Sequence, residues 1–135
     1  MQTPDQSFHI CLAGAVVSND WPLIQRLKAK HQVTVVERVR LLSRNSILAK
    51  VDVLVLDCSE SCGLGLRLLP FLKKFFPKLR IVLVDGGLTQ QQIAAAFSQG
   101  AQDYFSEPYD LALLAERAEA LGATMKSRET NSAPT

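Results

Sequence analysis

The chain has 135 residues, of which 47% are hydrophobic and 21% are charged, and its formal net charge is +2. That length suits one domain with its own core, and the composition excludes an intrinsically disordered chain. The small charge argues against direct nucleic-acid binding, no apolar run approaches the length of a membrane span, and the polar residues 1–7 lack a signal-peptide core. We therefore expect a soluble, cytoplasmic domain at 8–122. The polar tail at 123–135 is expected to fray or to link the domain to an effector.

Five apolar runs alternate with five segments of helical character along the domain. The runs expected to be strands are 8–15, 33–39, 51–57, 80–84 and 103–106. The helices are expected to start at Asn19 or Asp20, Ser43, Gly65, Thr89 and Asp110, and to end near 30, 49, 76, 100 and 122. Such alternation predicts a parallel five-stranded sheet with five helices, placed on both faces and joined by right-handed crossovers. This is the flavodoxin-like, doubly wound α/β fold.

Several positions predict how the helices are bounded and packed. Thr89 and Gln92 have the spacing of a capping box, and Gly100 suits the C-terminal cap of the same helix. Pro70 should delay the start of its helix or kink it, because proline lacks a backbone donor. The helical side chains expected to face the core are Leu23, Ile24, Leu27, Ile47, Leu48, Ile93, Ala96, Phe97, Leu111, Leu114, Ala118 and Leu121.

The strand that organises the domain is 51–57, with the sequence VDVLVLD. Its apolar residues are too continuous for a strand with one wet face, which predicts burial on both faces in the middle of the sheet. Asp57 then stands at the carboxyl end of this strand, at the edge where open α/β sheets carry ligand-binding and catalytic groups. The residues expected at the same edge, after the first, fourth and fifth strands, are Ala13, Gly14, Asp85 and Glu107.

Three short motifs accompany the order and spacing of the ten elements. They are the VDVLVLD strand that ends in Asp57, the pair Gly65-Leu66 eight positions later, and the segment GAQDYFSEP at 100–108. In these features the chain resembles, from Phe8 to Leu121, the receiver domain of two-component response regulators. The resemblance implies a site in which two acidic residues and the strand-end Asp hold Mg²⁺ while that Asp accepts a phosphoryl group from a histidine kinase. It also implies a lysine that pairs with the phosphoryl oxygens, and a Thr or Ser that moves together with an aromatic residue.

Part of that site is present in this sequence. Asp57 matches the phosphoacceptor of the family, and Tyr104 matches the switch aromatic. Pro108 matches the proline that follows the family's lysine, usually through a cis peptide bond. These matches concern one reactive group and two positions beside it.

The remaining site positions depart from the family pattern. Ala13 and Gly14 stand where the acidic pair is expected. Glu107 replaces the lysine, and Asp85 occupies the Thr/Ser switch position. Phosphoryl transfer depends on positioning and on positive charge set against the transferred oxygens. Two unit charges ~4 Å apart interact by about 4 kcal/mol at an effective dielectric near 20, so the added carboxylates disfavour an incoming phosphate.

The main hypothesis is therefore an atypical receiver domain, or pseudo-receiver, of a bacterial two-component-type signalling protein. It would act through protein–protein contact without aspartyl phosphorylation, and it would be neither an enzyme nor dependent on a cofactor. The resemblance implies a docking face made by the fourth helix, the fifth strand and the fifth helix. That face, around Tyr104 and Tyr109, would engage a second copy or an output partner, although half-buried tyrosines are also common packing residues.

Two alternative functions remain open at this point. The first is a phosphorylatable receiver, in which Asp57 accepts phosphate from a histidine kinase with help from the relocated carboxylates. Mg²⁺ would be a cofactor only in that case. The second is a small flavodoxin-like enzyme or nucleotide binder, which is disfavoured because no Gly-rich phosphate loop follows the first strand.

Two groups of residues in the sequence are of types that can bind metal ions, one of carboxylates and one of cysteines. Asp57, Asp85 and Glu107 would together offer hard oxygen ligands for a divalent cation, or else one or two of them would be protonated or point into water. Cys58 and Cys62 are four positions apart, but this spacing matches no standard zinc or dithiol motif. Reduced thiols in a cytosolic protein are the simplest interpretation.

Overall fold

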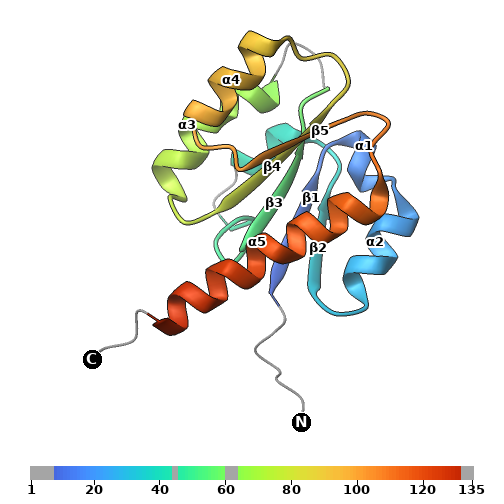
Figure 1. Cartoon of the computed structure of the whole chain (residues 1–135), viewed down its shortest axis with the longest axis vertical. Helices are drawn as coiled ribbons and strands as arrows, with labels where there is room; N and C mark the ends of the chain where they lie inside the picture. The colour runs from blue at the N-terminus through green and yellow to red at the C-terminus, as the bar shows by residue number, and fades with distance from the viewer. Residues whose placement is uncertain (1–7, 44–45, 60–63, 132–135) are drawn as a thin grey trace.

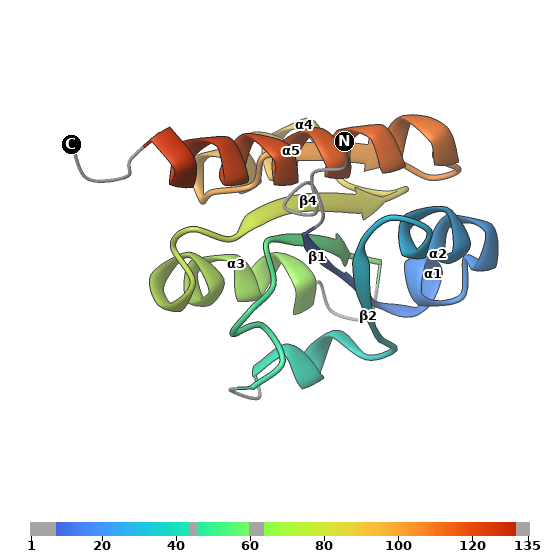
Figure 2. The ribbon, with the colours of Figure 1, turned by 90° about the horizontal axis from the view of Figure 1, so that it is seen from below.

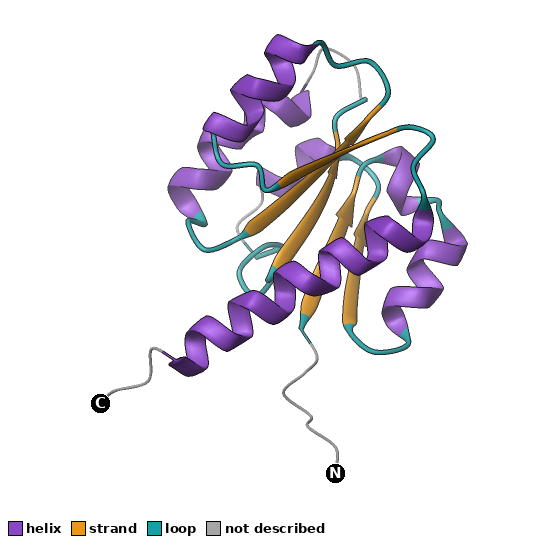
Figure 3. Cartoon of the chain, viewed as in Figure 1, coloured by secondary structure: helices purple, strands orange, loops and turns teal. Residues whose placement is uncertain are grey.

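The sheet has five parallel strands in the order β2-β1-β3-β4-β5. The structure is a computed structural model that describes residues 8–43, 46–59 and 64–131. The strands are β1 (His9–Ala13), β2 (Gln32–Val36), β3 (Val53–Asp57), β4 (Arg80–Asp85) and β5 (Asp103–Ser106). Helices lie around this sheet (Figure 3). The predicted doubly wound, flavodoxin-like fold is confirmed.

The helices cover both faces of the sheet, as parallel strands require. They are α1 (Ala15–Ser18), α2 (Trp21–Lys28), the 3₁₀ helix η2 (Val39–Ser43), α3 (Leu64–Phe75), α4 (Gln90–Ser98) and α5 (Leu111–Asn131). One apolar cluster joins the sheet to η2, α3 and α4, and a second joins it to α1, α2 and α5. Figure 1 shows α5 running across the strands, and Figure 2 shows α3 and α5 on opposite sides of β4.

The strand β3 lies in the middle of the sheet and is buried along its whole length. Its neighbouring residues point to opposite faces, so Leu54 and Leu56 pack in the first cluster while Val53 and Val55 pack in the second. Burial of each such side chain contributes roughly 1.5–3 kcal/mol. The predicted burial of this strand on both faces is confirmed, and Asp57 ends it with no exposed surface.

The second strand and the helix after it differ from the prediction. The strand ends at Val36 rather than Val39, because β2 pairs only with β1 and its last partner there is Ala13. The helix predicted from Ser43 to Ala49 is wrong: a 3₁₀ helix at Val39–Ser43 precedes a turn, and residues 44–45 lie outside the described part. The inward side chains from this connection are Val39, Leu42 and Leu48.

The first strand is also shorter than predicted, and a four-residue helix follows it. Gly14 has φ +107°, which turns the chain out of β1 and into α1. The next helix begins as predicted, because Asp20 Oδ1 accepts a hydrogen bond of 3.1 Å from the Leu23 amide. Sequence reasoning missed α1 because four residues carry too little periodicity to predict a helix.

The predicted boundaries of the later helices are confirmed at their caps. Thr89 and Gln92 form the capping box through hydrogen bonds of 3.1 and 2.9 Å, and Gly100 adopts φ +113° after α4. Asp110 Oδ1 accepts from the Leu113 amide at 3.1 Å, at the start of α5.

The predicted inward position of Phe97 and the late helix start considered for Pro70 are wrong. Phe97 is 44% exposed, whereas Ala96 beside it is buried, because the helix directs only one of these neighbours at the sheet. Pro70 does not delay its helix, since α3 already begins at Leu64 and includes the proline. The kink, which is the other prediction for Pro70, stays a prediction.

The last helix is longer than the sequence pattern indicated. It continues to Asn131, so residues 123–131 of the predicted polar tail are helical. A role of residues 123–135 as a linker stays a prediction. The segment beyond the core contains neither Gly nor Pro and is rich in good helix formers, which allows the helix to continue without an apolar stripe. The helices of the described residues include none long and apolar enough to cross a membrane.

Candidate functional site

The carboxyl ends of the central strands meet at one edge of the sheet. Asp57 is in register with Val84, and Asp85 is in register with Ser106, so the ends of β3, β4 and β5 lie side by side. Glu107 follows directly, and its amide donates to the Asp85 carbonyl oxygen at 3.1 Å. The structure therefore brings together the three carboxylates that the sequence placed at this edge.

Asp57 is held by donors from the chain itself. Its Oδ2 accepts a 2.8 Å hydrogen bond from the Val16 amide, at the start of α1. Its Oδ1 accepts from the Ser59 amide at 2.8 Å and from the Ser59 hydroxyl. The side chain has no exposed surface. In this arrangement Asp57 joins α1 and the loop after β3, and its two oxygens face amide and hydroxyl donors.

Gly14 lies directly against Asp57. A Cβ placed on Gly14 would be 2.3 Å from the Asp57 Cβ and 3.0 Å from its Oδ2, which is closer than real Cβ contacts allow. The backbone at Gly14 is fixed by its amide, which donates to the Val36 carbonyl at 2.8 Å. Ala13 is fully buried in the first apolar cluster. No side chain, acidic or otherwise, fits at position 14 beside Asp57 in this conformation.

Asp85, the last residue of β4, and Tyr104 of β5 are joined by a hydrogen bond. Asp85 is 7% exposed, and its Oδ1 accepts from the Gly87 amide at 2.5 Å. The Tyr104 hydroxyl donates to the Asp85 carbonyl oxygen at 2.7 Å, and burial raises the pKa of this phenol. Tyr104 is thus turned toward the loop at the switch position and is partly buried.

Glu107 differs from Asp57 and Asp85 in the surroundings of its carboxylate. Its Oε2 is buried and accepts no hydrogen bond from the described residues. Burial, followed by the nearby charges of Asp57 and Asp85, raises the pKa of the Glu107 carboxyl. The peptide bond from Glu107 to Pro108 is cis, as the resemblance implied.

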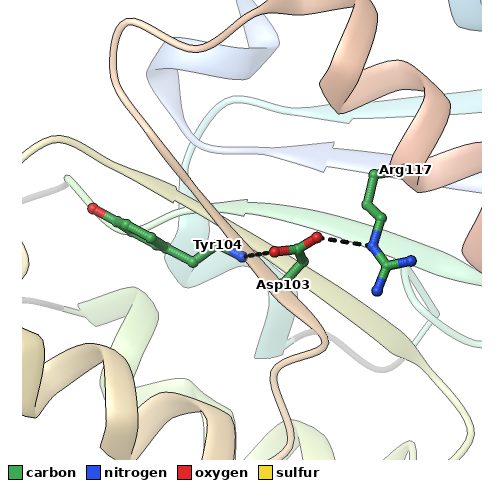
Figure 4. A network of polar contacts seen from close by, with 3 residues as sticks. All are labelled: Asp103, Tyr104 and Arg117. Carbon is green, nitrogen blue, oxygen red and sulfur yellow. Dashed lines mark hydrogen bonds and ion pairs between the residues drawn. The ribbon is translucent and has the colours of Figure 1, made fainter.

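The two tyrosines assigned to a docking face do not share a face of the sheet. Tyr104 packs against the first apolar cluster, and Tyr109 packs against the second. The surface of β5 and α5 carries instead an ion pair between Arg117 Nε and Asp103 Oδ2, at 2.8 Å (Figure 4). The other oxygen of Asp103 accepts from the Tyr104 amide at 2.7 Å.

The cysteine beside Asp57 is buried. Burial, and then the charges of Asp85 and Asp57, raises the pKa of the Cys58 thiol to about 12, which keeps it protonated at neutral pH. Cys62 lies outside the described residues, so the pairing considered for Cys58 stays untested. Within the described residues, Cys11 and Cys58 form no disulfide.

An open pocket of about 670 Å³ adjoins the carboxylates. Its lining residues are Val16, Asp20, Gly86, Glu107, Pro108, Tyr109 and Leu111. The Tyr109 hydroxyl donates to Asp20 Oδ2 across this pocket, and burial together with that bond raises the pKa of Tyr109. Sequence reasoning treated Asp20 only as a helix cap. Its proximity to Tyr109, 89 positions away, follows from the fold alone.

Within the described ranges, no group of three or more His, Cys, Asp or Glu side chains is arranged to hold a metal ion. The prospective oxygen ligands of Asp57 already face hydrogen-bond donors. Gly14 and Ala13 supply no carboxylate at the positions of the family's acidic pair. The residues present therefore do not fit the Mg²⁺ site that the resemblance implied.

Solved structures with this fold include many receiver domains. A CheY-like response regulator receiver domain protein of Methanospirillum hungatei is 16% identical over 90% of this chain and 98% of that one, with a TM-score of 0.74. The signal receiver domain of an HD domain-containing protein from Pseudomonas fluorescens is 19% identical over 98% of both chains, with a TM-score of 0.72. A pilus assembly-related protein of Burkholderia pseudomallei is 19% identical over 91% of this chain and 94% of that one, with a TM-score of 0.68.

Neither the protein-family models nor the curated proteins include a match to the chain. At identities this low, the structural likeness establishes the receiver fold and leaves the function to be argued from the site.

Proposed function

We propose that the chain is a pseudo-receiver, a domain with the receiver fold that acts by binding another protein and takes no phosphoryl group on Asp57. The observation that carries the proposal is the state of the Asp57 carboxylate, which is buried and accepts from the Val16 amide and from the Ser59 amide and hydroxyl. A phosphoacceptor must instead present a free oxygen to an incoming phosphorus atom.

The charges around Asp57 support the same proposal. Phosphoryl transfer needs positive charge against the transferred oxygens, and this edge carries Asp85 and Glu107. The ion pairs of the described residues do not include Glu107, and burial with the charges of Asp57 and Asp85 raises the pKa of its carboxyl. A phosphoryl group on Asp57 would add further negative charge beside these carboxylates. We propose no cofactor and no catalytic role.

The proposed partners are proteins. A second copy or an output domain could bind at α4, β5 and α5, and a histidine kinase is a partner only if Asp57 is phosphorylated. The similar structures include both response regulators and pilus assembly-related proteins, so the fold by itself does not choose among partners. We place the domain in the cytoplasm, where such signalling proteins act.

The proposal is tested by incubation with acetyl phosphate and Mg²⁺, followed by intact-mass measurement and by NMR shifts around Asp57. We expect no phosphoryl adduct in the parent chain. An adduct in the parent that disappears in Asp57→Asn would favour the phosphorylatable receiver and overturn the proposal. A bound cofactor absorbing in the visible range would instead favour the remaining alternative, a small flavodoxin-like enzyme.

A further inference from the structure

The open pocket beside Glu107 has a lining that combines acidic groups with an apolar wall. Its charged residues are Asp20 and Glu107, both acidic, and its apolar ones are Val16, Pro108 and Leu111. The ion pairs formed by the described residues, His31–Glu119 and Arg117–Asp103, involve neither of the two acids. No basic side chain of the described chain therefore neutralises this pocket by an ion pair.

Glu107, one of the two acids of this lining, gives a further reason to expect an occupant. One of its carboxylate oxygens is buried and has no hydrogen-bond donor among the described residues. A buried acceptor without a donor is unfavourable, and more so when it is charged, so the free domain carries an unfavourable group here. A donor with positive charge, brought close to this carboxylate from the pocket, would reduce that cost.

The only tryptophan of the chain is the next residue after Asp20, which lines the pocket. Trp21 opens α2 and is 61% exposed. Large exposed aromatic side chains are uncommon on a free surface and are enriched at the energetic centres of protein interfaces. An exposed aromatic residue is therefore adjacent in sequence to the acidic pocket lining.

We infer that this pocket docks an arginine or lysine side chain of a protein partner, with Glu107 as its counter-charge and Trp21 at the edge of the contact. The occupant follows from complementarity. Arginine and lysine have a long apolar stem and a cationic head, which match the wall of Val16, Pro108 and Leu111 and the acids beyond it. Nucleic acids and phosphorylated peptides are anionic and do not fit.

This inference rests on the proposed function, because it names the chemistry of the partner that the pseudo-receiver binds. It assigns a role to Glu107, which stands where the receiver family has a lysine. A cation at this position pairs with an anionic phosphoryl group, whereas a carboxylate pairs with a cation from outside. Glutamate in place of lysine would therefore change the preferred ligand of this sheet edge from an anion to a cation.

The test uses two terminally blocked tripeptides that differ only in charge, Leu-Arg-Leu and Leu-citrulline-Leu. Citrulline has nearly the shape of arginine but is neutral. Trp21 fluorescence reports binding, since the chain has no other tryptophan, and amide NMR shifts locate it. We expect saturable binding of the arginine peptide with a Kd on the order of 1 mM or tighter. The citrulline peptide should bind about tenfold or more weakly.

Two variants carry the same loss of one negative charge. Glu107→Gln should weaken arginine-peptide binding about tenfold or more, whereas Glu116→Gln, at an exposed position of α5, should leave it unchanged. Thermal melts verify that both variants are folded. Equal binding of the two peptides, no saturable signal up to on the order of 10 mM, or equal effects of the two variants would overturn the inference.

Self-association gives a separate readout. Sedimentation that shows a dimer abolished by Glu107→Gln would assign the pocket to a second copy of this chain and would overturn docking of a partner's side chain. A phosphoryl adduct on Asp57 would overturn the proposed function. Peptide binding is a separate measurement and tests the docking site by itself. Absence of peptide binding without an adduct would overturn only the docking site.

Discussion

At the scale of single residues, the contact between Gly14 and Asp57 determines what the sheet edge can hold. Gly14 has φ +107° and leaves no room for a Cβ beside the Asp57 side chain. The position is therefore constrained twice, by backbone conformation and by contact. The sequence shows that an acidic residue is missing there, but only the structure shows that Asp57 occupies the space such a residue would need.

We predict that Gly14→Ala destabilises the domain by about 3 kcal/mol or more, because the new Cβ forces both a strained φ and a shift of Asp57. Urea denaturation measures the change. The matched control is Gly87→Ala, where a Cβ would lie 3.6 Å from Asp85 Oδ1 in ordinary contact, and we expect a much smaller loss there. Equal stabilities of the two variants would contradict the packing described for Gly14.

At the scale of elements, local sequence signals determined the helix ends more reliably than the helix interiors. The cap residues Asp20, Thr89 and Asp110 each accept the hydrogen bond expected of them. A cap acts on amides two or three residues away, so its signal is contained in the local sequence. Phe97 was placed wrongly because the inward face of α4 depends on how the helix lies on the sheet.

We predict that Thr89→Ala lowers the free energy of unfolding by about 1 kcal/mol, because it removes the hydroxyl half of the capping box. Chemical denaturation measures the loss. Gln91→Ala, an exposed substitution in the first turn of the same helix, should change stability by only a few tenths of a kcal/mol. A comparable loss in both variants would mean that helix propensity, and not the cap, is being measured.

At the scale of the whole molecule, the parallel sheet brings three carboxylates from three separate segments to one edge. This arrangement disfavours the charged form of Glu107, since burial and the charges of Asp57 and Asp85 raise the pKa of its carboxyl above the ordinary 4.5. A carboxyl whose pKa is raised by folding binds its proton more tightly in the folded state. Its contribution to stability is therefore fully present below pH 4.5 and is lost as the pH rises through the raised pKa.

We predict that Glu107→Gln makes the domain more stable than the parent at neutral pH, by on the order of 1 kcal/mol, because it removes like-charge repulsion from a partly buried site. The difference in unfolding free energy between the variant and the parent should grow as the pH rises above 4.5 and then level off. Urea denaturation across a pH series measures it, with Glu116→Gln as the control that should show no such trend. A difference independent of pH would contradict the raised pKa.

The sequence by itself determined the five strands to within a few residues, the burial of β3 and the caps, because hydrophobic periodicity and cap chemistry act over a few neighbouring residues. It also identified Asp57, Asp85 and Glu107 as neighbours, since parallel strands must end at one edge. The tertiary structure decided what those residues do. Only packing places the Gly14 backbone against Asp57 and the Val16 amide on its carboxylate, and only the fold brings Asp20 to Tyr109. Contacts of this kind join positions far apart in the chain, and no local pattern encodes them.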